Sequence, residues 1–244
     1  MRPELPARLL TAVLAARLLV PATAQAQVGH DPARSPYQTL RFSQFISLTG
    51  GLLNGNGGAL GVAPHHGASL GLRYEFLSAG TITLGFQASL ADLERLVVNP
   101  IRPIATAVSG PIKQRTAIGE AIIQFNLTGG KTWHRIAPFV SAGLGLLVAA
   151  KTAQDSSSFS FRTRFTLTPG LGARVFLTDR LYLRLEARTS FWSVSYPASF
   201  RAAPSTALSE PPVLATPRKE WLANGWYTVG LGYAFSRPFQ TSDQ

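Results

Sequence analysis

Apolar and polar residues alternate along most of the chain after residue 38. The clearest example is residues 181–188, where every second position is Leu or Ala and the positions between hold Tyr182, Arg184, Glu186 and Arg188. Because side chains of a strand point to opposite faces in turn, the pattern predicts strands with one apolar and one polar face. We expect eight strands, at residues 40–49, 68–76, 81–91, 116–127, 136–149, 162–177, 181–192 and 225–235.

The segments between these strands alternate in length. The short connections are at residues 77–80, 128–135 and 178–180. They alternate along the chain with longer connections at 50–67, 92–115, 150–161 and 193–224. Short turns on one rim and long loops on the other are typical of outer-membrane barrels, in which the long loops face outward. The chain is therefore predicted to be all-β, an eight-stranded antiparallel up-and-down transmembrane β-barrel with both termini in the periplasm.

The two faces of the strands have different expected surroundings. Turning Arg184 and Arg188 toward lipid would cost about 2–4 kcal/mol each near the middle of the bilayer, so the apolar face is expected to point outward. The charged fraction of 14% is also low compared with about 25% in soluble proteins. No apolar run after the N-terminal segment approaches the roughly 20 residues that a membrane helix needs.

The polar face then lines a lumen that is just wide enough for its own side chains. Buried ions need partners, so we expect a hydrogen-bonded network inside the barrel, anchored by Glu186 and Glu120, and a lumen closed to diffusion. The network residues are Arg73, Glu75, Glu120, Arg174, Arg184, Glu186 and Arg188, with Arg41, Gln87 and Gln124 also facing inward.

A soluble lipocalin-like barrel, with the same alternation turned inside out, is the alternative architecture. Two features favour the membrane barrel. The lysines at 113, 131, 151 and 219 fall in predicted loops or turns, and Gly recurs on the polar face, where small residues leave room for arginines.

Aromatic residues gather near the expected rims, as in membrane-interface belts. Tyr74, Phe76, Trp133, Tyr233 and Phe235 are expected at the periplasmic rim, and Trp192, Trp221 and Trp226 at the outer rim. Pro169 lies inside a predicted strand, where its missing N–H predicts a bulge or a misplaced strand boundary.

The N-terminus has the pattern of a secretory signal peptide. Arg2 and Arg8 precede an apolar stretch and small residues that suit cleavage after Ala24 or Ala26. The expected organisation is a signal peptide at 1–26, a periplasmic segment at 27–37, an outer-membrane barrel at 38–235 and a short periplasmic tail at 236–244.

The last strand carries Thr228, Gly230, Tyr233 and Phe235, a polar residue, a glycine and two aromatics two residues apart. This pattern resembles the C-terminal assembly signal of bacterial outer-membrane barrels, and residues 38–235 resemble the OmpA/OmpX-like family of eight-stranded barrels. The resemblance implies recognition by periplasmic chaperones and the barrel assembly machinery, and insertion in the outer membrane of a Gram-negative cell. Here residues 236–244 follow Phe235, whereas family barrels often end at the final aromatic.

No catalytic, cofactor-binding or metal-binding pattern is recognisable. Some relatives in the family modify lipid A, and such chemistry would need a His near a Ser and a carboxylate. The histidines at 30, 65, 66 and 134 fit no such pattern, and the adjacent His65 and His66 are interpreted as solvated loop residues. We therefore expect no enzyme, no cofactor and no metal. The net charge of +11 comes from dispersed arginines without a nucleic-acid motif, so anionic lipid is the expected partner rather than nucleic acid.

With a filled lumen and no catalytic set, the long loops remain as the expected carriers of function. The leading hypothesis is a structural or surface-interaction protein that contacts lipopolysaccharide phosphates through Arg95, Arg102, Lys113 and Arg115. The alternatives are a narrow channel for small solutes, as in porin-like families, and a lipid A-modifying enzyme.

Overall fold

The computed structural model describes residues 35–150, 155, 159–206, 208–215 and 219–235. The predicted signal peptide, its cleavage site and the predicted tail at 236–244 lie outside the described residues, as does most of the predicted segment at 27–37. The described residues from Pro36 onward belong to one compact unit.

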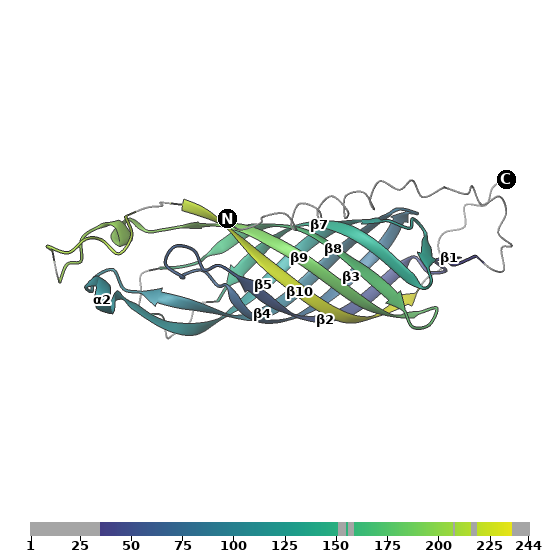
Figure 1. The fold of residues 1–244 in the computed structure, drawn as a ribbon, viewed down its shortest axis with the longest axis horizontal. Coiled ribbons are helices and arrows are strands. Elements are labelled where there is room, and N and C mark those ends of the chain that lie inside the picture. The colour runs from purple at the N-terminus through teal and green to yellow at the C-terminus, as the bar shows by residue number, and fades with distance from the viewer. Residues whose placement is uncertain (1–34, 151–154, 156–158, 207, 216–218, 236–244) are drawn as a thin grey trace, which may run out of the picture. The chain divides into compact units, whose positions relative to one another are not determined.

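Eight long antiparallel strands in this unit close into a barrel (Figure 1). Hydrogen-bonded neighbours follow the order β7, β5, β4, β3, β2, β10, β9, β8, and pairing of β7 with β8 completes the circle. The predicted fold class is confirmed. The strands are β2 (Gln44–Gly55), β3 (His66–Ala79), β4 (Ile82–Val98), β5 (Val108–Asn126), β7 (Ile136–Ala149), β8 (Thr163–Phe176), β9 (Leu181–Ser195) and β10 (Lys219–Phe235).

The two ends of the barrel differ, and we call them the turn end and the loop end. At the turn end, the short strands β1 (Tyr37–Thr39) and β6 (Lys131–Trp133) pair with each other beside β7. At the loop end, the connection between β4 and β5 carries the helix α2 (Ile104–Ala107), and the connection after β9 carries the 3-10 helix η2 (Ala198–Arg201) (Figure 1). Within the described residues, no helix is long and apolar enough to cross a membrane.

Strands at the loop end are longer than the alternation predicted. β4 and β5 stay paired as far as Val98 and Val108, so most of the predicted loop at 92–115 is a hairpin. At the loop end, β10 begins at Lys219 instead of 225, and β2 ends at Gly55 instead of 49. At the turn end, β2 is shorter than predicted and begins at Gln44 instead of 40. Lysines are consequently not confined to loops, because those at 113, 131 and 219 lie in strands, and the lysine at 151 lies outside the described residues.

A row of charged outward residues is the reason that the sequence predicted a loop where the structure has the β4–β5 hairpin. The outward positions of β4 and β5 are apolar up to Leu90, and the next two outward pairs join acids on β4 to bases on β5. Asp92 lies opposite Arg115, with 3.2 Å between Asp92 Oδ1 and Arg115 Nε, and Glu94 lies opposite Lys113. Charged side chains are costly in hydrocarbon, so this row indicates where the apolar part of the membrane ends.

Pro169 interrupts a ladder without shifting it. β8 pairs with β9 at Leu167 with Phe191 and again from Gly170 with Arg188, in one unchanged register. The bulge predicted at Pro169 is therefore wrong, since the missing N–H is accommodated by two unpaired positions instead of an extra residue. The side chain of Pro169 points outward.

Candidate functional site

The seven predicted network residues are brought together inside the barrel. Strand parity turns every second side chain inward, and four strands contribute to the network. Each of the seven is at most 6% exposed. β3 supplies Arg73 and Glu75, β5 supplies Glu120, β8 supplies Arg174, and β9 supplies Arg184, Glu186 and Arg188.

Glu75 binds three arginines. Arg73 donates from Nε to Glu75 Oε1 at 2.9 Å, and Arg174 donates from Nη2 to Glu75 Oε2, also at 2.9 Å. Arg184 Nη1 donates to the same carboxylate at 3.0 Å. A carboxylate with three buried guanidinium partners is fully compensated, which is the condition for keeping it charged out of water.

Glu186 is the second hub. Its Oε2 accepts from Arg73 Nη1 at 3.1 Å, and its Oε1 accepts from Arg184 Nη2 at 3.2 Å. Ser141 on β7 donates to the same carboxylate at 3.2 Å, and Arg188 Nε lies 3.9 Å from Oε2. Arg73 and Arg184 thus bridge both hubs, so the carboxylates of β3 and β9 are joined across the lumen.

Glu120 stands apart from this pair. Arg188 Nη1 donates to Glu120 Oε2 at 2.7 Å, and Thr168 donates to Oε1. The sequence predicted Glu186 and Glu120 as anchors, whereas the structure gives the second central position to Glu75. Alternation identifies which carboxylates face inward, but the stagger between strands decides how many arginines each one reaches.

Three further residues were predicted to face inward, namely Gln87, Gln124 and Arg41, and the first two do so. Arg73 donates to Gln87 Oε1 at 3.3 Å, and Arg184 donates to Gln124 Oε1 at 3.1 Å. Arg41, by contrast, does not face inward. Its side chain is 75% exposed and pairs with Asp179 at the turn end, because Arg41 precedes β2.

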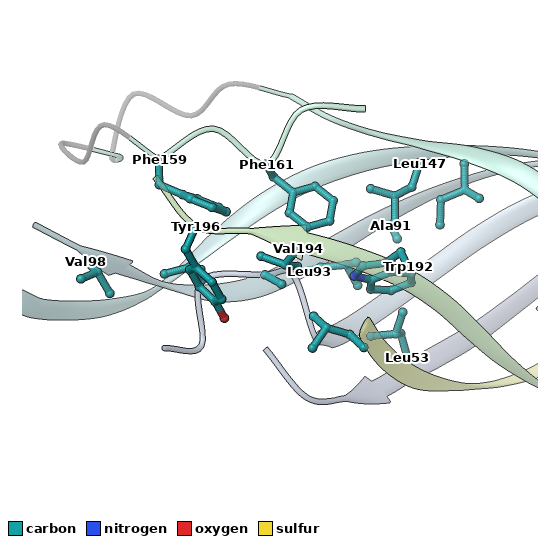
Figure 2. Close-up of a cluster of buried hydrophobic side chains, with 14 of the residues drawn as sticks. Leu53, Ala91, Leu93, Val98, Leu147, Phe159, Phe161, Trp192, Val194 and Tyr196 are labelled. Atoms are coloured by element: carbon teal, nitrogen blue, oxygen red, sulfur yellow. The ribbon is translucent and has the colours of Figure 1, made fainter. Parts of the chain in front are cut away.

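A large apolar cluster, which we call the loop-end cluster, fills the barrel beyond the network. Figure 2 shows side chains of the strands meeting those of the loops, including Phe159 and Phe161 against Trp192 and Val194. This cluster was not predicted from the sequence, although inward positions of β4 and β9 are apolar there, as at Leu93 and Val194. The cluster consists of Leu53, Val62, Ala63, Ala91, Leu93, Val98, Ile118, Leu147, Phe159, Phe161, Trp192, Val194, Tyr196, Phe200, Leu214, Leu222 and Trp226.

Two tryptophans assigned to the outer aromatic belt belong to this cluster instead. Trp192 is 0% and Trp226 is 2% exposed, and both point into the barrel. Trp221 does face outward, at 64% exposure. The belt prediction was wrong for the first two because both occupy inward positions of their strands, opposite Leu222 and Arg188 respectively.

Arg95 also lies inside the barrel and not in a loop. It is 1% exposed in β4, donates from Nε to Gln114 Oε1 and forms an ion pair with Asp155. A buried guanidinium cannot meet a lipid phosphate, so the predicted lipopolysaccharide contact of Arg95 is corrected. Arg102, in the connection after β4, is exposed, and Lys113 and Arg115 are exposed on the outward face of β5.

The four residues of the predicted assembly signal lie in β10. Thr228 and Gly230 face inward, whereas Tyr233 and Phe235 face outward at the turn end. Arg180 Nη1 donates to Tyr233 Oη at 2.8 Å, and the rings of Phe235 and Tyr74 lie 6.5 Å apart. The outward aromatics thus form part of one patch at the rim.

The histidines are dispersed. His65 Nδ1 lies 2.9 Å from the Ala63 carbonyl, His66 opens β3, and His134 packs edge-on against Trp133 at the turn end. In the part of the chain that the structure describes, no group of three or more His, Asp or Glu residues is arranged to hold a metal ion.

One pKa shift lies in the loops. Burial, followed by the hydrogen bond to Glu220, raises the pKa of Tyr196 above its usual value. Tyr196 donates to Glu220, and Glu220 also accepts from the backbone N–H of Ala59 at 2.8 Å. Glu220, at the start of β10, therefore ties the loop after β9 to the loop after β2.

No protein-family model and no curated sequence matches this chain. Its fold does match solved structures. Neisserial surface protein A, from Neisseria, matches with a TM-score of 0.50 at 12% identity, over 79% of this chain and 97% of that chain.

Two barrels from Pseudomonas aeruginosa match as well. The outer membrane protein OprG has a TM-score of 0.47 at 13% identity, covering 81% of this chain and 98% of that chain. The N-terminal β-barrel domain of OprF has a TM-score of 0.39 at 11% identity, covering 80% and 99%. With its closed ring of eight antiparallel strands and apolar outward face, the chain has the fold of an eight-stranded outer-membrane β-barrel.

Proposed function

We propose that this barrel is a structural, surface-interaction protein of the outer membrane whose loop end contacts lipopolysaccharide phosphates. The observation that carries the proposal is the position of Arg115 and Lys113. They occupy the first two outward positions of β5 beyond its apolar outward residues, and we place the headgroups of the surrounding lipid at this level. Arg102 adds an exposed cation in the connection between β4 and β5.

These cations are available to a phosphate. The side chains of Arg115 and Asp92 are 72% and 56% exposed, and an exposed ion pair contributes only about 0–1 kcal/mol. A charge-assisted hydrogen bond to phosphate is stronger than such a pair, and a guanidinium donates two parallel bonds to it. Asp92 therefore does not prevent Arg115 from binding a headgroup.

Lipopolysaccharide retention tests the proposal. The full-length protein is purified from outer membranes in mild detergent, and bound lipopolysaccharide is quantified per barrel. Changing Arg102, Lys113 and Arg115 together to Glu should reduce retention several-fold, because attraction to phosphates becomes repulsion. The matched control changes three exposed cations of the turn end, Arg41, Lys131 and Arg135, to Glu and should retain the wild-type amount. Equal retention in both variants would refute the contact.

A further inference from the structure

The outward face of β5 carries three small residues in successive outward positions, Ala117, Gly119 and Ala121. Their cross-strand neighbours on β7 are the larger Val148, Leu146 and Leu144. On the β4 side the neighbours are Leu90, Ala88 and Phe86. The apolar wall of the barrel is therefore recessed along β5 and at Ala88 of β4.

This recess is a measurable hollow. It has a volume of about 600 Å³ and opens on the lipid-facing side, with Leu72 and Leu90 on one side and Leu146 and Val148 on the other. At its floor, a methyl group added to Gly119 would meet no atom within 4 Å. The floor is thus open space and not a close approach of backbones, so the glycine is not explained by packing within the protein.

A second hollow of about 350 Å³ lies between β3 and β4, nearer the loop end, and reaches Asp92 and Arg115. The exposed cross-strand partners Leu70 and Leu90 line both hollows and stand between them. The groove on β4 and β5 is therefore the first hollow, and Arg115, paired with Asp92, is the next outward residue of β5 beyond Ala117. Lys113 is the next outward residue of β5 beyond Arg115.

We propose that this groove, the β5 groove, holds one acyl chain of lipid A while a lipid A phosphate binds Arg115 and Lys113. The assignment rests on the proposed function, in that it uses the same cations. The groove opens onto the membrane, so its occupant is a membrane component. The loop end of an outer-membrane barrel faces the outer leaflet, where an apolar chain attached to an anionic headgroup matches the groove and its charged end.

The test measures binding of purified hexa-acylated, bisphosphorylated lipid A to the full-length protein by native mass spectrometry. Gly119→Leu combined with Ala117→Leu fills the groove while leaving every charge in place. The matched control is Ala187→Leu, which adds the same side chain to the outward face of β9, away from the groove. Heat-modifiable migration in detergent gels verifies that each variant is folded.

We expect the groove-filling variant to bind lipid A several-fold more weakly, because the acyl chain loses the van der Waals contacts that the groove provides in an apolar surrounding. The Ala187→Leu control should bind as the wild type does. Phosphatidylglycerol should bind more weakly than lipid A and should not respond to the groove-filling change.

The outcomes separate the groove from the proposed function. If the Arg102, Lys113 and Arg115 reversal weakens binding but groove filling does not, the groove assignment is overturned and the phosphate contact stands. If only groove filling weakens binding, the phosphate contact is overturned. Equal binding of phosphatidylglycerol, with the same response to groove filling, would overturn lipid A as the occupant. Detergent-solubilised dimers that groove filling disperses would assign the groove to a second copy of the chain.

Discussion

Four arginines and three glutamates of the network share one buried space, with Glu75 and Glu186 each contacting three arginines. Aromatic rings supplement the carboxylates: the guanidinium of Arg174 lies 4.4 Å from the ring centre of Phe45, and that of Arg184 lies 4.3 Å from the ring centre of Phe139. Cations over ring faces are stabilised in this way, particularly when desolvated. The network holds one more arginine than it has glutamates, and these ring contacts offset part of the excess positive charge.

Removing one hub carboxylate should be costly. Glu186→Ala leaves Arg73 and Arg184 with fewer partners in a buried site, and breaking a buried ion pair costs about 3–5 kcal/mol. Asp179→Ala is the matched control because it removes a carboxylate from an exposed pair, at a cost below about 1 kcal/mol. Denaturant unfolding of the barrel in lipid vesicles measures both. Unchanged stability in Glu186→Ala would mean that the network does not hold the barrel together.

The sequence determined which side chains enter the lumen, since period-two alternation specifies a face for each residue of a strand. It did not determine the point along each strand beyond which the outward face no longer contacts lipid. Arg95 was assigned to a loop because the charges beside it hid the continuing strand. Trp192 was assigned to a lipid-facing belt although it shares the inward parity of Arg184 and Arg188. Contacts such as those of Glu75 depend on the stagger between strands, which no single strand encodes.

At the scale of elements, β8 and β9 form the least complete pair of the wall. Among the described residues, their ladder ends toward the loop end at Leu167 with Phe191. Above that point, Thr163–Thr166 of β8 pair with β7 alone, and the facing part of β9 pairs with β10 alone. β5, by contrast, is paired with β4 and β7 on both sides from Thr116 to Phe125.

Amide hydrogen exchange should reveal this difference. Amides of residues 163–166 that point toward β9 have no ladder partner, so they should exchange far faster than amides of β5 residues 117–121. Exchange followed by NMR in lipid nanodiscs resolves the two groups within one sample, which makes β5 the internal control. Equal protection in both segments would show that β8 and β9 are joined along their full length in the membrane.

At the scale of the whole molecule, two large groups of side chains fill the barrel along its axis. The charged network occupies the lumen between β3 and β9, and the loop-end cluster follows it with residues such as Phe161, Trp192 and Val194 (Figure 2). A small apolar cluster lies at the turn end, around Phe45 and Tyr182. An ion would need to pass packed apolar side chains and displace paired guanidiniums in sequence, and each step costs free energy.

We therefore predict that the purified protein produces no stable, reproducible conductance in planar lipid bilayers. The recording is made with protein whose folding has been verified by heat-modifiable migration, and a porin of known conductance inserted under the same conditions serves as the positive control. Uniform current steps that scale with the number of inserted barrels would contradict the prediction and would favour the channel hypothesis.

The row formed by Asp92, Arg115, Glu94 and Lys113 also sets how far the molecule stands above its membrane. β4 continues beyond Asp92 to Val98. Six residues of a strand tilted by about 40° rise roughly 15 Å. Under the proposed function, the tip that carries α2 therefore stands above the lipid phosphates. On that proposal a large particle approaching from outside the cell meets this tip before it can reach the β5 groove below.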